Sequence, residues 1–215
     1  MIRNPFEAPT ASGIVAAPAV VRPAASIRPF LVFEEFLVIE ELVRLLRFTL
    51  AREAKFKPTT VRREGGSSRV DVEYRRSQAI FKLEEFYELF GVRLLAYLPF
   101  IFERLGEAPF EPTWIEAQIT ASNDGDFYRP HADSQHSTLR TRAITFVYYF
   151  YRPPKAFTGG ALQIYDDAQR ASTVAPALNR MVLFSSTRLH EILPVSCPSR
   201  RFADSRFALN GWIHR

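Results

Sequence analysis

Cysteine is nearly absent from this chain of 215 residues, and no apolar run is long enough to cross a bilayer. The single cysteine, Cys197, cannot form an internal disulfide, so the sequence does not call for an oxidising compartment. Near the N-terminus, Glu7, Pro9 and Pro18 interrupt an apolar patch that would otherwise resemble a secretory signal. We therefore expect a cytoplasmic protein with no membrane partner.

The overall composition is that of a globular domain, with 47% hydrophobic and 24% charged residues. A net charge of +5 is compatible with nucleic-acid binding, but no basic stripe interleaved with aromatic residues is present, so we predict no nucleic-acid partner. Five arginines do gather in one region, at positions 62, 63, 69, 75 and 76. They suit an acidic or extended peptide substrate, or form a solvated surface. Nothing in the sequence indicates the oligomeric state.

The pattern along the chain predicts one domain over residues 29–215, preceded by an extended or mobile Pro- and Ala-rich arm over residues 1–28. Helical spacing of apolar residues predicts helical support over residues 38–106, with one helix at about 38–53 and a longer one from Leu83 to Ile101, kinked at Pro99. Between them we expect a loop over residues 62–69 and a short strand carrying Val70, Val72 and Tyr74.

From residue 114 to the end the texture is that of β-structure, because β-branched and aromatic runs alternate with turn residues. Helices followed by many short strands predict an α+β fold, a sandwich or barrel with helices packed on one face. The expected strands cover residues 114–122, 127–133, 143–151, 161–165, 181–185, 190–194 and 206–213.

The chain has four histidines, and two of them suggest a metal site. His131 and Asp133 stand two apart on a predicted strand and so point the same way, and His190 begins a later strand. Two imidazoles and one carboxylate on one face suit iron(II) with open coordination positions, whereas structural zinc sites are usually cysteine-rich. An isolated His-x-Asp is more often a surface hydrogen bond. We expect His136 to face substrate or solvent and His214 to lie on the surface.

Five segments strengthen the metal interpretation because they occur together and in a fixed order: G-D-F-Y-R-P-H-A-D, R-x-I-T-x-x-Y-Y, G-G-x-L, H-E-x-L-P-V and R-F-x-L-x-G-W. Together they resemble the iron(II)/2-oxoglutarate-dependent dioxygenases, in their prolyl-hydroxylase-like branch. The resemblance covers residues 114–215 closely and the helical part loosely. It implies a double-stranded β-helix, or jelly roll, with the N-terminal helices packed on the larger sheet.

Position by position, the resemblance implies roles for eight residues. The iron(II) ligands would be His131, Asp133 and His190. The distal carboxylate of 2-oxoglutarate would be held by Arg206 and Tyr149, a task that suits the planar, permanently charged guanidinium. The walls of this pocket would be Val147, Leu162 and Asn210. The implied reaction consumes O2 and 2-oxoglutarate, gives succinate and CO2, and hydroxylates an unactivated C–H bond, with ascorbate as a supporting reductant.

The sequence departs from the family at three places. The gap between His190 and the arginine is longer than usual, because residues 196–205 form an insert. Counting from His190 selects Arg200 or Arg201, whereas counting back from Trp212 selects Arg206; strand register favours Arg206. Many relatives carry threonine where this chain has Asn210, and the tyrosine often found before the His-x-Asp strand is missing.

The substrate follows less directly. The resemblance favours a prolyl residue in a protein or peptide; the alternatives are a free amino acid or other small molecule, or a jelly-roll binding protein without catalysis. Trp212 stands where nucleic-acid demethylases of this superfamily carry a second arginine. Asp133, which halogenating relatives lack, favours hydroxylation.

Overall fold

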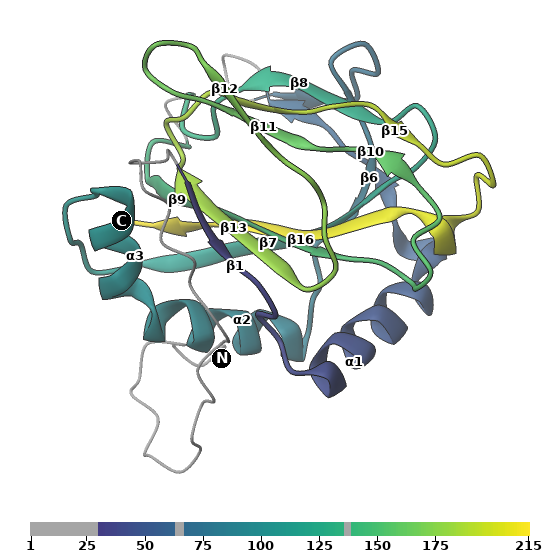
Figure 1. The fold of residues 1–215 in the computed structure, drawn as a ribbon, viewed down its shortest axis with the longest axis horizontal. Helices are drawn as coiled ribbons and strands as arrows, with labels where there is room; N and C mark the ends of the chain where they lie inside the picture. The colour runs from purple at the N-terminus through teal and green to yellow at the C-terminus, as the bar shows by residue number, and fades with distance from the viewer. Residues whose placement is uncertain (1–29, 63–66, 136–138) are drawn as a thin grey trace.

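The larger of two facing β-sheets forms the centre of the protein (Figure 1), which we describe from a computed structural model over residues 30–62, 67–135 and 139–215. This seven-stranded sheet is antiparallel throughout, and its long central strands pair along their whole length. In sheet order its strands are β1 (Phe30–Phe33), β13 (Arg180–Ser185), β9 (Arg142–Phe150), β16 (Arg206–His214), β7 (Trp114–Ser122), β6 (Gln78–Ile80) and β2 (Lys57–Pro58).

A smaller, five-stranded sheet covers one face of the larger one (Figure 1). Its strands, in order, are β12 (Ala171–Val174), β11 (Leu162–Tyr165), β14 (His190–Ile192), β8 (Phe127–His131) and β5 (Arg75–Arg76). Two short antiparallel pairs complete the β-structure: β10 (Thr158–Gly159) with β15 (Val195–Ser196), and β3 (Val61–Arg62) with β4 (Ser68–Arg69). The predicted α+β jelly roll is confirmed.

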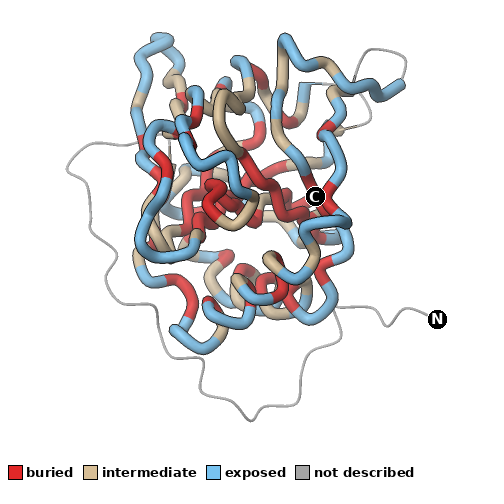
Figure 2. Tube along the Cα trace, turned by 90° about the vertical axis from the view of Figure 1, so that its right-hand side faces the viewer, coloured by how far each residue is buried: buried red, intermediate tan, exposed pale blue. Residues whose placement is uncertain are grey.

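Three α-helices cover the other face of the seven-stranded sheet (Figure 1), as the resemblance implied. They are α1 (Ile39–Leu50), α2 (Glu85–Ala96) and α3 (Leu98–Leu105), and two 3-10 turns lie at Glu53–Lys55 and Phe202–Asp204. The apolar side of α1 buries Leu42, Leu45 and Phe48 in the main core. Figure 2 shows the buried positions concentrated where the layers meet. The helices thus pack on one face of the sheet, and the candidate site lies on the opposite face.

Strand β9 is buried on both faces, which explains why its sequence reads as a continuous apolar run. Phe146 and Tyr148 point into the core shared with the helices, whereas Val147 and Tyr149 belong to a second cluster between the two sheets. The same alternation holds in β16, where Phe207 faces the helices.

The structure corrects three expectations about the segment before residue 114. Val70, Val72 and Tyr74 do not form a strand, because the chain turns there, and the strands lie on either side. At the ends of the expected loop over residues 62–69, Arg62 and Ser68–Arg69 instead belong to the paired strands β3 and β4, and residues 63–66 lie outside the described residues. The second helix is broken rather than kinked: α2 ends at Ala96 and α3 restarts with Pro99 in its first turn, where a missing N–H costs no hydrogen bond.

Two expectations fall outside the described residues: the N-terminal arm and the role of His136. Among the described residues, no helix is long and apolar enough to span a membrane.

Two glycines give a matched test of this packing. A Cβ at Gly211 in β16 would lie 1.9 Å from the carbonyl oxygen of Glu116, which is backbone, whereas a Cβ at Gly91 in α2 would meet only Ile115 at 3.8 Å. We expect Gly211→Ala to destabilise the fold by about 1–3 kcal/mol. Gly91→Ala should stabilise it by about 0.5–1 kcal/mol, because alanine favours helix. Urea unfolding measures both, and equal effects of the two substitutions would contradict the packing described here.

Candidate metal centre and co-substrate pocket

Neighbouring strands of the smaller sheet bring the three candidate metal ligands together. His131 ends β8 and pairs directly with His190, which begins β14. Asp133 follows His131 by two residues, and its carboxylate oxygens lie 3.7 Å from His131 Nε2 and 3.4 Å from His190 Nε2. All three side chains are buried, and one ligand atom from each lies within 4.8 Å of the others. The arrangement is thus compact enough to hold one metal ion.

Backbone carbonyls fix the orientation of both imidazoles. His131 Nδ1 lies 2.8 Å from the Arg129 carbonyl oxygen, and His190 Nδ1 lies 2.9 Å from that of Arg188. A carbonyl only accepts, so each Nδ1 carries the proton and each Nε2 presents its lone pair to the centre. Burial lowers the pKa of His131 to about 3, so this ring stays neutral at ordinary pH.

The carboxylate is oriented from the opposite sheet. Thr145 on β9 donates a hydrogen bond to Asp133 Oδ2 at 2.7 Å, and its hydroxyl lies 2.9 Å from that of Ser186. Oδ2 is thereby held close to His190 Nε2, and Oδ1 lies toward His131 Nε2. Such support is typical of metal-binding carboxylates, whose partners fix the ligand geometry.

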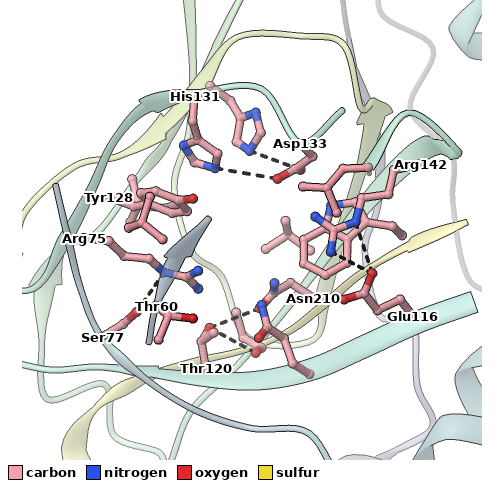
Figure 3. A pocket seen from close by; sticks show the side chains of 18 of the residues that line it. Thr60, Arg75, Ser77, Glu116, Thr120, Tyr128, His131, Asp133, Arg142 and Asn210 are labelled. Carbon is pink, nitrogen blue, oxygen red and sulfur yellow. Dashed lines mark hydrogen bonds and ion pairs between the residues drawn. The ribbon is translucent and has the colours of Figure 1, made fainter. Parts of the chain in front are cut away.

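The triad opens on a cavity of about 1010 Å³ between the two sheets (Figure 3). His131 and Asp133 lie on one side of it, with Thr120 and Asn210 across from them. The three ligands come from one side only, which leaves coordination positions facing the cavity. Open coordination positions are typical of catalytic metal sites, where the metal binds other molecules. Structural metal sites are instead closed by protein ligands.

Arg206 and Tyr149 place unsatisfied polar atoms at the buried end of the same cavity. Arg206 is 2% exposed and Tyr149 is fully buried, and the guanidinium carbon lies 4.8 Å from the centre of the tyrosine ring. Within the described part of the chain, Arg206 Nε and Nη2 and the Tyr149 hydroxyl have no hydrogen-bond partner. Burial lowers the pKa of Arg206 and raises that of Tyr149. A carboxylate placed there would satisfy all three atoms.

The Gly-Gly pair makes room for this arginine. Gly159 and Gly160 both have positive φ, at 68° and 66°, a backbone conformation that favours glycine. A Cβ on Gly160 would lie 2.6 Å from Arg206 Cδ and 2.8 Å from Val195 Cγ2. Glycine is therefore needed at position 160 for conformation and for space.

Comparison with known proteins agrees with this geometry. The 2OG-Fe(II) oxygenase superfamily matches residues 117–214, which contain the triad and Arg206. Residues 117–214 of the chain are thus similar to this superfamily. An uncharacterised PKHD-type hydroxylase of Synechocystis sp. is 41% identical over 154 residues, covering 66% of this chain and 51% of the relative. The chain thus spans about half the length of that relative.

Solved structures share the fold of this chain. A prolyl-4-hydroxylase of Pseudomonas putida superposes with a TM-score of 0.64 at 22% identity, covering 87% of this chain and 93% of the other. A prolyl hydroxylase of Trichoplax adhaerens superposes with a TM-score of 0.62 at 19% identity, covering 86% of this chain and 83% of the other. That protein was solved with a peptide fragment of the hypoxia inducible factor oxygen degradation domain. At such identities the likeness shows the jelly-roll fold.

The site residues expected from the sequence line or border this cavity. Val147, Leu162 and Asn210 line it together with the triad and Arg206, and Asn210 Oδ1 accepts a hydrogen bond from Thr120 at 3.2 Å. Tyr149 packs between Val147 and Arg206 in the same cluster between the sheets.

The two rival arginines lie elsewhere. Arg200 is exposed and pairs with Asp124, and Arg201 is exposed and pairs with Asp204, so neither enters the cavity. The choice of Arg206 by strand register is consistent with where the three arginines lie.

Sequence reasoning missed two cavity residues beside His131. Tyr128 stacks on the His131 ring, with centroids 3.5 Å apart, and burial raises its pKa to about 12. The Arg75 guanidinium lies 4.5 Å from the Tyr128 ring centre and faces the cavity (Figure 3). Tyr128 is the tyrosine of the motif G-D-F-Y-R-P-H-A-D, so the sequence contained a signal for it. For Arg75 the only signal was its membership of the group of five arginines between residues 62 and 76.

His214 is not a surface residue as expected: it is 3% exposed. Strand β16 runs further than predicted and places His214 opposite Trp114 of β7. The two rings stack at 4.1 Å, and His214 Nδ1 lies 2.9 Å from the Thr141 hydroxyl. Its Nε2 is 3.4 Å from Glu116, which also accepts two hydrogen bonds from Arg142. The open end of the cavity thus carries an ordered aromatic and ionic group.

Metal titration tests the centre directly. We expect His131→Ala and His190→Ala each to abolish binding of iron(II) or of manganese(II) as a probe, because two ligands do not hold an open site. Thr145→Val should weaken metal binding by about 10- to 100-fold, as loss of an orienting partner does. Thr173→Val, on the exposed strand β12, serves as the control and should leave affinity unchanged. Tight binding after loss of either histidine would contradict the assignment.

Proposed function

We propose that the chain is an iron(II)- and 2-oxoglutarate-dependent dioxygenase that hydroxylates a prolyl residue in a protein or peptide, with succinate and CO2 as co-products. One observation carries the proposal furthest: Arg206, a buried guanidinium with no anionic partner among the described residues, lines the same cavity as the three metal ligands. Burying a cation is costly unless an anion accompanies it, so the site is built for a carboxylate.

Iron(II) would be held by His131, Asp133 and His190, and when bound it would supply the activation of O2 that no side chain can provide. The protein's own contribution is geometric. The carbonyls of Arg129 and Arg188 hold the imidazoles, and Thr145 holds the carboxylate, before any ligand arrives. The metal therefore meets preorganised donors.

2-Oxoglutarate would reach from the metal to Arg206. The guanidinium and the Tyr149 hydroxyl would donate hydrogen bonds to its distal carboxylate, and a charge-assisted contact of this kind is about twice as strong as a neutral one. Val147 and Leu162 offer apolar walls to its methylene groups, and Asn210 lines the cavity nearby. The buried position of Arg206 also keeps water from competing for the carboxylate.

The remaining part of the cavity would hold the substrate. Tyr128 and Trp212 offer aromatic surface beside the metal ligands, which suits the apolar ring of proline. The relatives support the same assignment, since the Trichoplax prolyl hydroxylase was solved with a peptide. A single observation favours the second candidate, a free amino acid or other small acid. Arg75 lies beside the cavity, and its Nε has only a long contact of 3.4 Å to the Ser77 hydroxyl.

Succinate release decides between these substrates. The full chain would be incubated with iron(II), 2-oxoglutarate and ascorbate against proline-containing peptides, the same peptides with alanine for proline, and free amino acids. We expect succinate release and the gain of one oxygen atom, by mass spectrometry, for proline-containing peptides only. Oxidation of free amino acids alone would favour the second candidate. Absence of 2-oxoglutarate turnover with every substrate would indicate a binding protein without catalytic activity.

The role of Arg206 has its own test. We expect Arg206→Ala to raise the 2-oxoglutarate concentration needed for half-maximal turnover by at least about 100-fold, on the order of 3 kcal/mol for a charge-assisted bidentate contact. Arg200→Ala and Arg201→Ala are matched controls on exposed arginines and should change it by less than about threefold. Direct binding of 2-oxoglutarate without O2 gives a second readout. A large effect at Arg200 or Arg201 with none at Arg206 would overturn the assignment.

A further inference from the structure

Two strands of the larger sheet form a continuous floor to the cavity. Alternate side chains of β7 and β16 face it in cross-strand register, and all of them line it. From the closed end outward, the pairs are Ser122 with Arg206, Thr120 with Ala208, Gln118 with Asn210, Glu116 with Trp212 and Trp114 with His214. The proposed co-substrate would occupy the closed end of this floor, at Arg206. The open end, at Trp114, has no role in the proposed function so far.

Trp114 is a large apolar side chain that is 45% exposed at the edge of the reaction cavity. One face of its indole ring stacks on His214, with centroids 4.1 Å apart and planes within 25°. His214 is itself 3% exposed and held by Thr141, so the stack rests on a fixed support. The other face of the indole is therefore a rigid apolar surface, and rigid aromatic surfaces of this kind are typical anchors in recognition.

Exposed apolar side chains are normal when they occur singly, so exposure alone means little. Val92 on α2 shows the ordinary case: it is 43% exposed and does not belong to the cavity lining. Trp114 differs in two respects, because it lines the cavity that holds the metal ligands and because its ring is immobilised from below.

The distance from the metal is set by the strand. Trp212 lies directly opposite Thr145, the residue that binds Asp133, so this part of the floor is next to the metal ligands. The Trp114–His214 pair is one pleat further out, about 7 Å along the strands. An extended peptide advances about 3.3–3.6 Å per residue, so this step corresponds to roughly two residues.

The surroundings favour an apolar occupant over a charged one. Glu116 accepts hydrogen bonds from Arg142 at 3.1 and 2.7 Å and lies 3.4 Å from His214 Nε2, so its charge is already matched (Figure 3). Arg142 in turn stacks on Trp212 at 3.5 Å. Neither member of this ion pair is left to attract a charged side chain. An aliphatic or aromatic side chain on the free indole face would bury apolar area at no electrostatic cost.

We propose that Trp114 is a specificity-determining residue that binds an aliphatic or aromatic side chain of a peptide substrate, about two residues from the hydroxylated one. This inference rests on the proposed function, since it takes the substrate to be a peptide. It goes beyond that function by naming a sequence preference and the side chain that reads it.

The test is a peptide series around one proline, in which the residues two before and two after it are varied in turn among leucine, phenylalanine, serine, aspartate and lysine. Wild-type enzyme should oxidise the leucine and phenylalanine peptides, at one of the two positions, with kcat/KM about tenfold above the serine peptide. In Trp114→Ala this preference should fall to less than about twofold through KM, with kcat and the 2-oxoglutarate requirement unchanged. Trp114→Phe should retain part of it, and Val92→Ala, the exposed apolar control, all of it.

Two results would overturn the inference while leaving the proposed function intact. One is a wild-type enzyme that oxidises all peptides equally; the other is a Trp114→Ala variant that keeps the preference or loses the same factor on every peptide, which would indicate a structural role. Failure of the proposed function looks different: the wild-type enzyme then oxidises no proline peptide while still consuming 2-oxoglutarate, and the inference falls with it.

Discussion

The buried guanidinium of Arg206 is the constraint around which the site is arranged. Taking an unpaired cation out of water is unfavourable, yet neighbouring residues accommodate this guanidinium in the interior. Gly160 removes the Cβ that would collide with its side chain, and Tyr149 lies beside it with a hydroxyl that is also unpaired. A cation held in this way weakens the ligand-free fold and strengthens it once a carboxylate is bound. Binding of a carboxylate ligand at Arg206 would therefore be coupled to the stability of this domain.

Strand β16 connects this constraint to the rest of the fold. Its alternate residues belong to different environments: Phe207 and Leu209 pack against the helices, whereas Arg206 and Ala208 face the cavity. A slip of one residue would send the guanidinium into the helix-facing core and the phenylalanine into the site. The helices thus contribute to function from a distance, because the apolar face that they bury fixes the register on which the arginine depends.

The sequence was most informative where function depends on local pattern. His131 and Asp133 are close in the chain, and strand alternation singled out Arg206 over Arg200 and Arg201; the structure brings these residues together as expected. It was least informative where placement depends on distant segments. The alternation of Val70 and Val72 suggested a strand, but these residues are half exposed in a turn and have no buried face to fix them.

The same reason explains the other residues that were misplaced. Arg75 enters the cavity because β5 pairs with β8, a contact between short strands that carry no periodicity. His214 was expected at the surface because it stands next to the last residue. It is buried because β16 pairs with β7 to its end and because Trp114 covers it. Both errors concern tertiary pairing, which no local pattern of these residues encodes.

Charge balance divides the cavity into two ends with different tasks. A divalent metal and Arg206 together carry more positive charge than Asp133 neutralises, and the two carboxylates of 2-oxoglutarate would offset the excess. Without ligands the charges of Arg206 and Asp133 cancel, so a divalent metal and the co-substrate would keep the site neutral only when they bind together. The outer end needs no such ligand, since Glu116 and Arg142 already match each other. Electrostatics would therefore couple the binding of metal and co-substrate, whereas at the outer end shape and apolar contact would select the substrate.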